Sequence, residues 1–301
     1  MLGGVILLWF LFAALSVLFV GADIRRTPEA PVMKWGFVIV TAFTGPVGAF
    51  LYALGCREPL PRTHERYVAA KWRQVLGSTL HCVAGDGLGI LAAAVVSRSL
   101  GLPMGAELVA EYLTGFLFGW TVFQALFMRG MVGGSYGRSL AGTVVPEFLS
   151  MNGVMAGMVA VMVPAMARVA GATAPDSPRF WFLMSMALLA GLIVTYPINW
   201  WLVGQGLKHG MMTVRPDGDP LPLAGGLWAA GPALRAESGH GANSAAGGRH
   251  HEAHGDRGDE ARAPAGTHTR HPAGGGARPL VGAGAVTLGF LALALALAGV
   301  F

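Results

Sequence analysis

The chain has 301 residues, of which 53% are hydrophobic and only 12% are charged. Soluble domains carry about 25% charged residues, so this composition excludes an ordinary soluble globular domain. The net charge of +5 comes mainly from segments between apolar blocks, and no basic patch is interleaved with aromatic residues. This pattern is typical of a protein oriented in a lipid bilayer and does not fit nucleic-acid binding.

Apolar blocks recur along the chain at the length that a bilayer requires, which is about 20 residues. Because lipid leaves backbone polar groups unsatisfied, each block is expected to be a helix. The sequence therefore predicts an all-α, polytopic helical protein of the cell membrane, with about seven transmembrane helices. The blocks are roughly 1–21, 35–55, 79–99, 106–128, 147–169, 180–207 and 281–301.

Residues 1–72 are predicted to hold two transmembrane helices and a basic loop. The first block has no basic residue before it and no clear small-residue cleavage site, which favours a retained helix over a signal peptide. Cys56 and Cys82 flank the loop that follows the second block. A disulfide between them is one reading and two free thiols are the other, because two cysteines do not establish a bridge.

The predicted core, residues 73–213, holds four helices and every polar intramembrane motif. Its first helix reads TLHCVAGDGLGI, in which Cys82 and Asp86 are four residues apart and share a helix face beside His81. A carboxylate inside a bilayer costs about 2.5–3.5 kcal/mol, so an intramembrane acid marks a functional site or a paired group. The structural alternative is that Asp86 fixes a helix contact, supported by nearby glycines that let backbones approach.

The next two helices combine packing motifs with soft donor atoms. GFLFG at 115–119 is a small-residue motif that predicts helix contact. Methionines then recur along one narrow stripe of the following helix, with Asn152 beside the first of them. Thioethers fill irregular packing gaps, and they also select Cu(I). The stripe consists of Met151, Met155, Met158, Met162 and Met166.

The last core helix ends in YPINWWLVGQGLKHGMMT at 196–213. Paired tryptophans are typical of the headgroup level, so the turns after them are expected to emerge from the bilayer. Lys208 would then snorkel to water, and His209 would either bond a loop carbonyl or bind a ligand.

The start of the first core helix, the start of the third and the end of the fourth are expected at one membrane face. Imidazole, thiolate and thioether groups there suit copper as Cu(I), and histidine with cysteine alone would also suit zinc. The predicted metal ligands are His81, Cys82, Asp86, Met151, Met155, His209 and Met211. The predicted supporting polar residues are Asn152, Tyr196, Asn199 and Lys208.

Residues 214–280 are rich in Gly, Ala and His and cannot build a core, so they are predicted to be a disordered linker before the last helix, 281–301. The run RHHEAH contains His250, His251 and His254, which is typical of a second metal site or of compositional drift.

Counting Lys and Arg in short loops gives nine inside and six outside if the N-terminus is cytoplasmic. This count favours a cytoplasmic N-terminus, although the pair Arg25–Arg26 directly after the first helix favours the opposite.

The segments HCVAGDGLG, MNGVMAGM and YPINWWLVGQGLKHGMMT resemble the bacterial family called domain of unknown function 4396, over roughly residues 73–213. The resemblance implies a multi-helix protein of the bacterial inner membrane, and it identifies no reaction. Some relatives carry copper-related names. The family's motif positions fall here on His81, Asp86, Asn152, Tyr196, Pro197, Asn199, Trp200, Lys208 and His209.

Copper binding, transfer or transport is the first functional expectation. One alternative is a metal-free or proton-coupled transporter of a small solute, in which Asp86 titrates. Another is a non-enzymatic assembly factor or subunit that docks on a partner membrane protein. An enzyme is not favoured, because the chain has no Ser-His-Asp set and no phosphate-loop spacing. A haem protein using His81 or His209 would be the enzymatic alternative.

Overall fold

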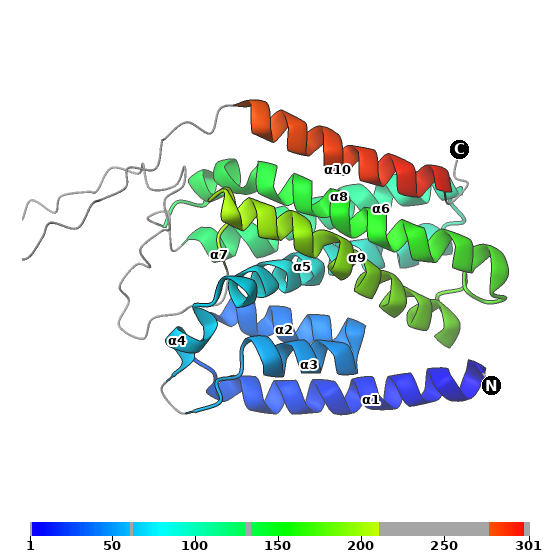
Figure 1. The fold of residues 1–301 in the computed structure, drawn as a ribbon. Coiled ribbons are helices and arrows are strands. Elements are labelled where there is room, and N and C mark those ends of the chain that lie inside the picture. Colours follow the sequence, from blue (N-terminus) through cyan, green and yellow to red (C-terminus); the bar gives the residue numbers. More distant parts are fainter. Residues whose placement is uncertain (1, 61–62, 130–133, 211–276, 298–301) are drawn as a thin grey trace, which may run out of the picture.

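The computed structural model describes residues 2–60, 63–129, 134–210 and 277–297, and this part of the chain is helical without strands. The helices form one bundle with their axes roughly along a common direction (Figure 1). The chain is therefore an all-α protein of membrane type, as predicted. Within the described ranges, five helices are long and apolar enough to cross a bilayer.

The N-terminal part consists of one long helix and a short hairpin rather than two crossing helices. Its elements are α1 (Leu2–Asp23), η1 (Ile24–Arg26), α2 (Pro31–Thr44), α3 (Pro46–Gly55) and α4 (His64–Val68). The predicted span 35–55 is broken at Gly45, where φ is +56°. Only glycine adopts this backbone conformation readily. At about 1.5 Å per residue neither α2 nor α3 reaches across a hydrocarbon core of about 30 Å.

The chain leaves the hairpin at the end where it entered. Tyr52 on α3 donates a hydrogen bond to Asp23 Oδ2 at the end of α1, at 2.8 Å, and its hydroxyl lies 2.9 Å from Thr27 Oγ1. The turn at Gly45 lies against Ala13, midway along α1. The predicted count of seven crossing helices is therefore not met, because block 35–55 turns back on itself.

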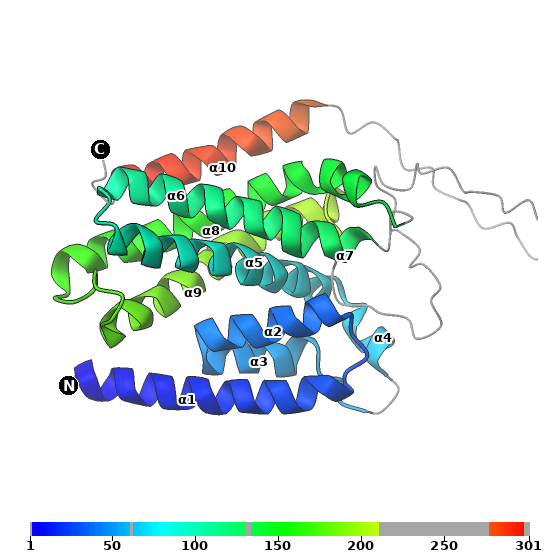
Figure 2. The ribbon, with the colours of Figure 1, turned by 180° about the vertical axis from the view of Figure 1, so that it is seen from behind.

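The second part of the chain forms the core of the bundle. Its elements are α5 (Lys71–Ser99), α6 (Met104–Phe118), the π-helical segment η2 (Gly119–Gln124), α7 (Ala125–Arg129), α8 (Tyr136–Arg168) and α9 (Pro178–Gly204). α10 (Ala277–Leu297) packs on the outside of α8 (Figures 1 and 2). α6, η2 and α7 follow one another without a loop, so the predicted helix 106–128 corresponds to a helical path that the π-helical segment interrupts.

Glycines bring α5 and α6 into backbone contact. A Cβ atom on Gly89 would lie 2.6 Å from Thr114 O, and one on Gly85 would lie 3.0 Å from Gly119 Cα. A Cβ on Gly115 would lie 3.1 Å from the backbone oxygen of Asp86. The predicted packing role of the small residues in both motifs is confirmed.

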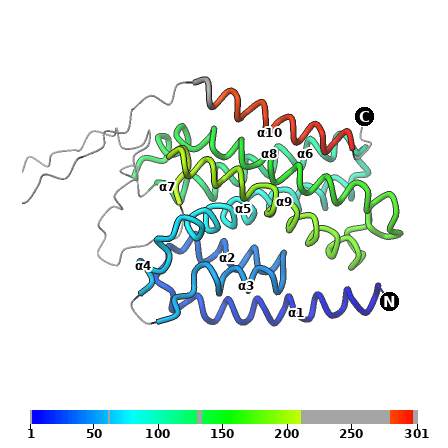
Figure 3. Tube along the Cα trace, in the orientation of Figure 1, coloured from blue at the N-terminus to red at the C-terminus, as the bar shows by residue number. Residues whose placement is uncertain are grey.

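One end of the bundle gathers the segments that the sequence predicts to be together. α1, α3, α7 and α9 end there, and α5, α8 and α10 begin there, whereas α1 begins and α10 ends at the other end (Figures 1 and 3). We call this the Lys208 end. The shared face of α5, α8 and α9 that was expected from the order of the helices is therefore present.

Candidate functional site in the membrane core

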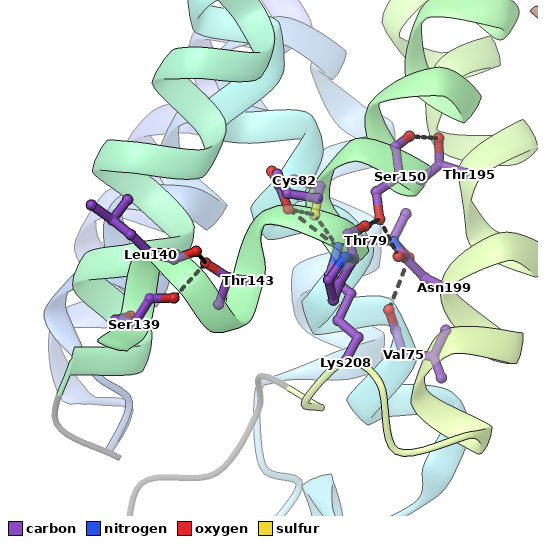
Figure 4. A network of polar contacts seen from close by, with 12 residues as sticks. Val75, Thr79, Cys82, Ser139, Leu140, Thr143, Ser150, Thr195, Asn199 and Lys208 are labelled. Carbon is purple, nitrogen blue, oxygen red and sulfur yellow. Dashed lines mark hydrogen bonds and ion pairs between the residues drawn. The ribbon is translucent and has the colours of Figure 1, made fainter. Parts of the chain in front are cut away.

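The ammonium group of Lys208 is the centre of a buried polar cluster. Its Nζ atom lies 2.7 Å from Cys82 Sγ, 2.7 Å from Ser150 Oγ and 3.4 Å from Glu147 Oε2 (Figure 4). The Cys82 thiol is also 3.5 Å from the same Glu147 oxygen. We call Cys82, Asp86, Glu147, Ser150 and Lys208 the Lys208 cluster. α5, α8 and the turn after α9 each contribute side chains to it.

The turn after α9 directs Lys208 inward. Gly206 takes a φ of +68°, and the backbone N–H groups of Leu207 and Lys208 donate to Leu202 O. This left-handed glycine with paired hydrogen bonds is a common way to end a helix. Lys208 is only 3% exposed, so the expectation that it snorkels to water is wrong. The chain bends back before that residue, and its side chain enters the bundle.

A chain of hydrogen bonds continues from Ser150 across to α5. The Ser150 hydroxyl donates to Asn199 Oδ1 at 2.7 Å or to Pro146 O at 2.9 Å. Asn199 Nδ2 donates to Thr79 Oγ1 at 3.0 Å (Figure 4). The side chains of Ser150, Asn199 and Thr79, which form this series of hydrogen bonds, are all buried. Asn199 therefore links α9 to both α5 and α8.

Asp86 and Glu147 place two carboxyl groups beside the single ammonium group. Asp86 is fully buried and interacts electrostatically with Glu147. Neither Asp86 oxygen accepts a hydrogen bond from a donor in the described part of the chain. A Cβ atom on Gly119 would overlap Asp86 Oδ1 and lie 2.9 Å from Glu147 Oε1. The first residue of η2 must therefore be glycine for both carboxyls to fit.

The π-helical segment η2 packs against α5 and α8 beside the cluster. Gly119 contacts the carboxyl pair, and Phe123 contacts the ring of His81. Gln124 is buried and its Oε1 atom has no hydrogen-bond partner among the residues described. π-helical turns inside α-helices are frequently found at functional sites.

His81 lies beside the cluster in an aromatic pocket. Its ring centroid is 5.3 Å from that of Phe123 and 5.5 Å from that of Phe127. Neither ring nitrogen has a hydrogen-bond partner within the described ranges, although the side chain is buried. The structure therefore does not bring the His81 nitrogens into contact with Cys82 or Asp86, the two other ligands predicted on α5.

The predicted residues on α5 lie deeper than expected. The helix begins at Lys71 rather than at residue 79, so Asp86 is at its midpoint. Hydropathy missed the first turns because Lys71, Arg73 and Gln74 interrupt the apolar pattern there. The cluster thus lies inside the bundle and not at a membrane face, and Lys208 reaches it from the Lys208 end.

The methionine stripe leads away from the cluster. Met155, Met158 and Met162 are buried on α8 and line a cavity of about 20 Å³ toward the opposite end of the bundle. The same cavity is also lined by Met104, Met166, Met184, Arg98, Glu107 and Glu111. Met151 instead places its methyl group against Gly115. Of the two predicted methionine ligands on α8, only Met155 lines this cavity.

The other predicted polar residues hold helices together or lie elsewhere. Asn152 accepts a hydrogen bond from Tyr112 Oη at 2.6 Å and donates to Thr287 Oγ1 at 3.1 Å, which links α6 and α10 to α8. Tyr196 donates to Trp72 O at 3.3 Å. His209 is partly buried at the Lys208 end, and burial lowers its pKa. The predicted ligands Met211, His250, His251 and His254 lie outside the described residues.

The pKa of Lys208 reflects two opposing effects. Burial alone lowers the pKa of a lysine, because it penalises the charged form. Cys82 and Glu147 attract the ammonium group and more than offset this, so the pKa of Lys208 is raised above its ordinary value of 10.5. Lys208 therefore carries a positive charge at neutral pH despite its burial.

Sequence reasoning missed Glu147, Ser150 and Thr79. The apolar block was taken to begin at 147, which placed Glu147 at a membrane face, but α8 begins at Tyr136. Glu147 is thus about 16 Å along the helix at 1.5 Å per residue. Pro146 makes a helix start near residue 147 look plausible, because proline is common at the first position of a helix. The residue directly before it, Val145, is not a capping residue, which is the signal that the helix begins earlier.

The two cysteines are free, and each belongs to a separate set of contacts. Cys82 contacts Lys208 and Glu147, whereas Cys56 is 3.9 Å from Glu29 Oε1 in the N-terminal part of the bundle. The disulfide alternative is therefore not realised.

Comparison with known families covers the part of the chain that contains the cluster. Residues 71–208 match the family model described as Domain of unknown function (DUF4396). The match begins at the start of α5 and ends at Lys208, so it includes all five residues of the cluster. No curated protein and no solved structure matches the chain.

Proposed function

We propose that the DUF4396 region is the proton-binding core of a membrane transporter for a small solute. The observation that carries this proposal is the burial of two carboxyl groups, both on helices of membrane length, beside one ammonium group from the turn after α9. Ionisable groups inside a bilayer are costly, and they mark proton relays or ion pathways by default.

The charge count of the cluster supports binding of one proton. If Asp86 and Glu147 are both ionised, Lys208 neutralises only one of them. Neighbouring buried carboxylates repel each other, and a shared proton removes that repulsion. The cluster then exists in a neutral form with one proton and in an anionic form without it, which is the pair of states that a proton-coupled carrier requires.

Lys208 also argues against a metal ion within the cluster. Its ammonium group lies 2.7 Å from Cys82 Sγ, where a metal bound by this thiolate would be placed. A cation there would be repelled by the ammonium charge at close range. Polar groups from Ser150 to Thr79 extend the cluster toward α9 and provide hydrogen-bonding partners for a solute.

The first test is infrared spectroscopy of the full chain in lipid across a pH titration. A buried protonated carboxyl gives a carbonyl band, and Asp86→Asn or Glu147→Gln is expected to remove or shift it. Glu111→Gln is the matched control, because Glu111 is a buried acid on α6 that lines the methionine cavity. In proteoliposomes, a potential-driven proton flux is expected in wild type and in Glu111→Gln, and its loss in Asp86→Asn. A carbonyl band and flux unaffected by both cluster variants would contradict the proposal.

Copper handling is the second candidate, and the methionine cavity favours it. Six methionines line that cavity with Glu107 and Glu111, and thioether sulfurs select Cu(I). We therefore place the copper proposal at this cavity rather than at Cys82.

Under reducing conditions, Cu(I) retained against a chromophoric chelator is expected to fall in the double variant Met158→Leu with Met162→Leu. The control is the double variant His81→Ala with His209→Ala, which changes imidazoles and leaves the cavity intact. Equal retention in wild type and the methionine variant would reject copper at the cavity, and loss in the histidine variant alone would return it to the Lys208 end.

A further inference from the structure

Three side chains of metal-ligand type meet at the Lys208 end, outside the DUF4396 match. Glu29 lies between η1 and α2, Cys56 directly follows α3, and His64 begins α4. One ligand atom from each lies within 4.8 Å of the other two, and all three residues are buried. In the described residues this is the single group of three His, Cys, Asp or Glu side chains with such spacing.

The distances approach those of a tetrahedral zinc site. His64 Nε2 is 2.9 Å from Glu29 Oε1, and Cys56 Sγ is 3.9 Å from the same oxygen. Around a tetrahedral Zn²⁺ the corresponding separations are about 3.4 Å and about 3.6 Å, from ordinary metal–ligand bond lengths. For these two pairs, shifts of about half an ångström or less would give the tetrahedral separations, and the third pair, Cys56 and His64, lies within 4.8 Å.

Two atoms of the group have no other partner. Glu29 Oε2 and His64 Nδ1 are buried and accept or donate no hydrogen bond in the described part of the chain. Glu29 is 5% exposed and His64 is 3% exposed, so water does not compensate them. A buried polar atom without a partner costs about 1–3 kcal/mol, and an ion bound by both oxygens of Glu29 would remove that cost at Oε2.

We infer that Glu29, Cys56 and His64 form a binding site for a zinc-class transition-metal ion. Cysteine sulfur, histidine nitrogen and carboxylate oxygen are the donors that Zn²⁺ uses, and three protein ligands leave one position for water. The ion ties the segment before α2, the end of α3 and the start of α4 together. Bound metal therefore clamps both ends of the α2–α3 hairpin against the end of α1.

The test uses the full chain, purified in detergent without metal and titrated with Co²⁺ as a spectroscopic substitute for zinc. Histidines in the stretch 214–280 also bind Co²⁺, but that stretch contains no cysteine. A thiolate-to-cobalt charge-transfer band therefore reports only Cys56 or Cys82. We expect the band in wild type, its displacement by Zn²⁺, and its loss in Cys56→Ser and in His64→Gln. Cys82→Ser, which removes the other buried thiol, is the matched control and keeps the band.

A second measurement needs no variant and covers the case in which a substitution prevents folding. Alkylation of the two cysteines in wild type is followed by mass spectrometry of their peptides, with and without Zn²⁺. At a Zn²⁺ concentration ten times its dissociation constant, alkylation of Cys56 is expected to slow about tenfold, with Cys82 unchanged. Absence of the charge-transfer band, its loss in Cys82→Ser alone, or equal alkylation rates with and without Zn²⁺ would each overturn the inference.

Discussion

Lys208 and Gly119 show how single residues determine the cluster. Lys208 supplies the only positive charge among its five side chains, and Gly119 leaves the space that the two carboxyls occupy. Neither role follows from residue type. Lysine after an aromatic belt ordinarily snorkels to water, and glycine in an apolar helix ordinarily allows helix contact.

Lys208→Met is expected to destabilise the protein strongly, because it leaves Glu147 and Asp86 buried without a counter-charge. Removing one partner of a buried ion pair costs about 3–5 kcal/mol. The pKa of Lys208 is raised above 10.5, so its stabilisation is fully present at pH 7 and is lost only as pH rises past that value. Thermal unfolding in detergent at pH 7 measures the loss.

Lys71→Met, which removes a cation that lies 4.8 Å from the Trp200 ring, is the control and should lower the unfolding midpoint far less than Lys208→Met does. Equal midpoints for the two variants would refute the role of Lys208.

Gly119→Ala is expected to disrupt the carboxyl pair, since the added Cβ would overlap Asp86 Oδ1. Overpacking of this kind costs about 1–3 kcal/mol. Gly105→Ala is matched to it, because Gly105 lies in the helix that leads into η2 and has open space where its Cβ would be. That control is expected to change stability by less than about 1 kcal/mol. Thermal unfolding and the infrared carbonyl band are measured for both, and a band unchanged in Gly119→Ala would show that the carboxyls do not need this space.

At the scale of the helices, apolar blocks predicted where most elements lie but not where each begins or turns. The long blocks correspond to α1, α5, α8, α9 and α10, since hydropathy averages over many residues. Glu147 was placed at the start of its helix because a charged residue ends an apolar block in the sequence even when the helix continues through it. The break at Gly45 was missed because apolar content says nothing about chain direction. Gly45–Pro46 was the available signal, since a residue before proline is disfavoured in helices.

The Lys208 cluster was predicted in part for a related reason. Cys82, Asp86, Asn199 and Lys208 were named from motifs within single segments, but their partners Glu147, Ser150 and Thr79 come from other helices. The contact between them depends on the rotation of each helix about its axis. One sequence does not specify that rotation when the helix is apolar on most sides, as α5 and α9 are.

For the whole molecule, the α2–α3 hairpin changes the orientation that the loops imply. Because the hairpin returns to the end where it started, the loops after α1 and after α3 share one side. Outside α10, ten Lys and Arg residues of the described chain then lie at the Lys208 end and three, Arg98, Arg168 and Arg179, at the other. From this distribution the positive-inside rule predicts that the Lys208 end faces the cytoplasm and that the N-terminus does not. This assignment reverses the one that followed from a full crossing by residues 35–55.

Labelling from one side of the membrane tests this arrangement. Arg26→Cys, Arg66→Cys and Arg179→Cys introduce thiols at exposed positions, whereas Cys56 and Cys82 are buried. An impermeant maleimide is expected to label the first two only in inverted vesicles, and the third only in right-side-out vesicles. Labelling of Arg26→Cys and Arg66→Cys from opposite sides would mean that residues 35–55 cross the bilayer after all.

α9 ends and α10 begins at the Lys208 end of the bundle, where the segments that carry Glu29, Cys56 and His64 also lie. The proposed site of these three residues would therefore exchange its ion with one compartment only. A chelator confined to that side of the bilayer is expected to strip the metal from this site, and a chelator confined to the other side is not.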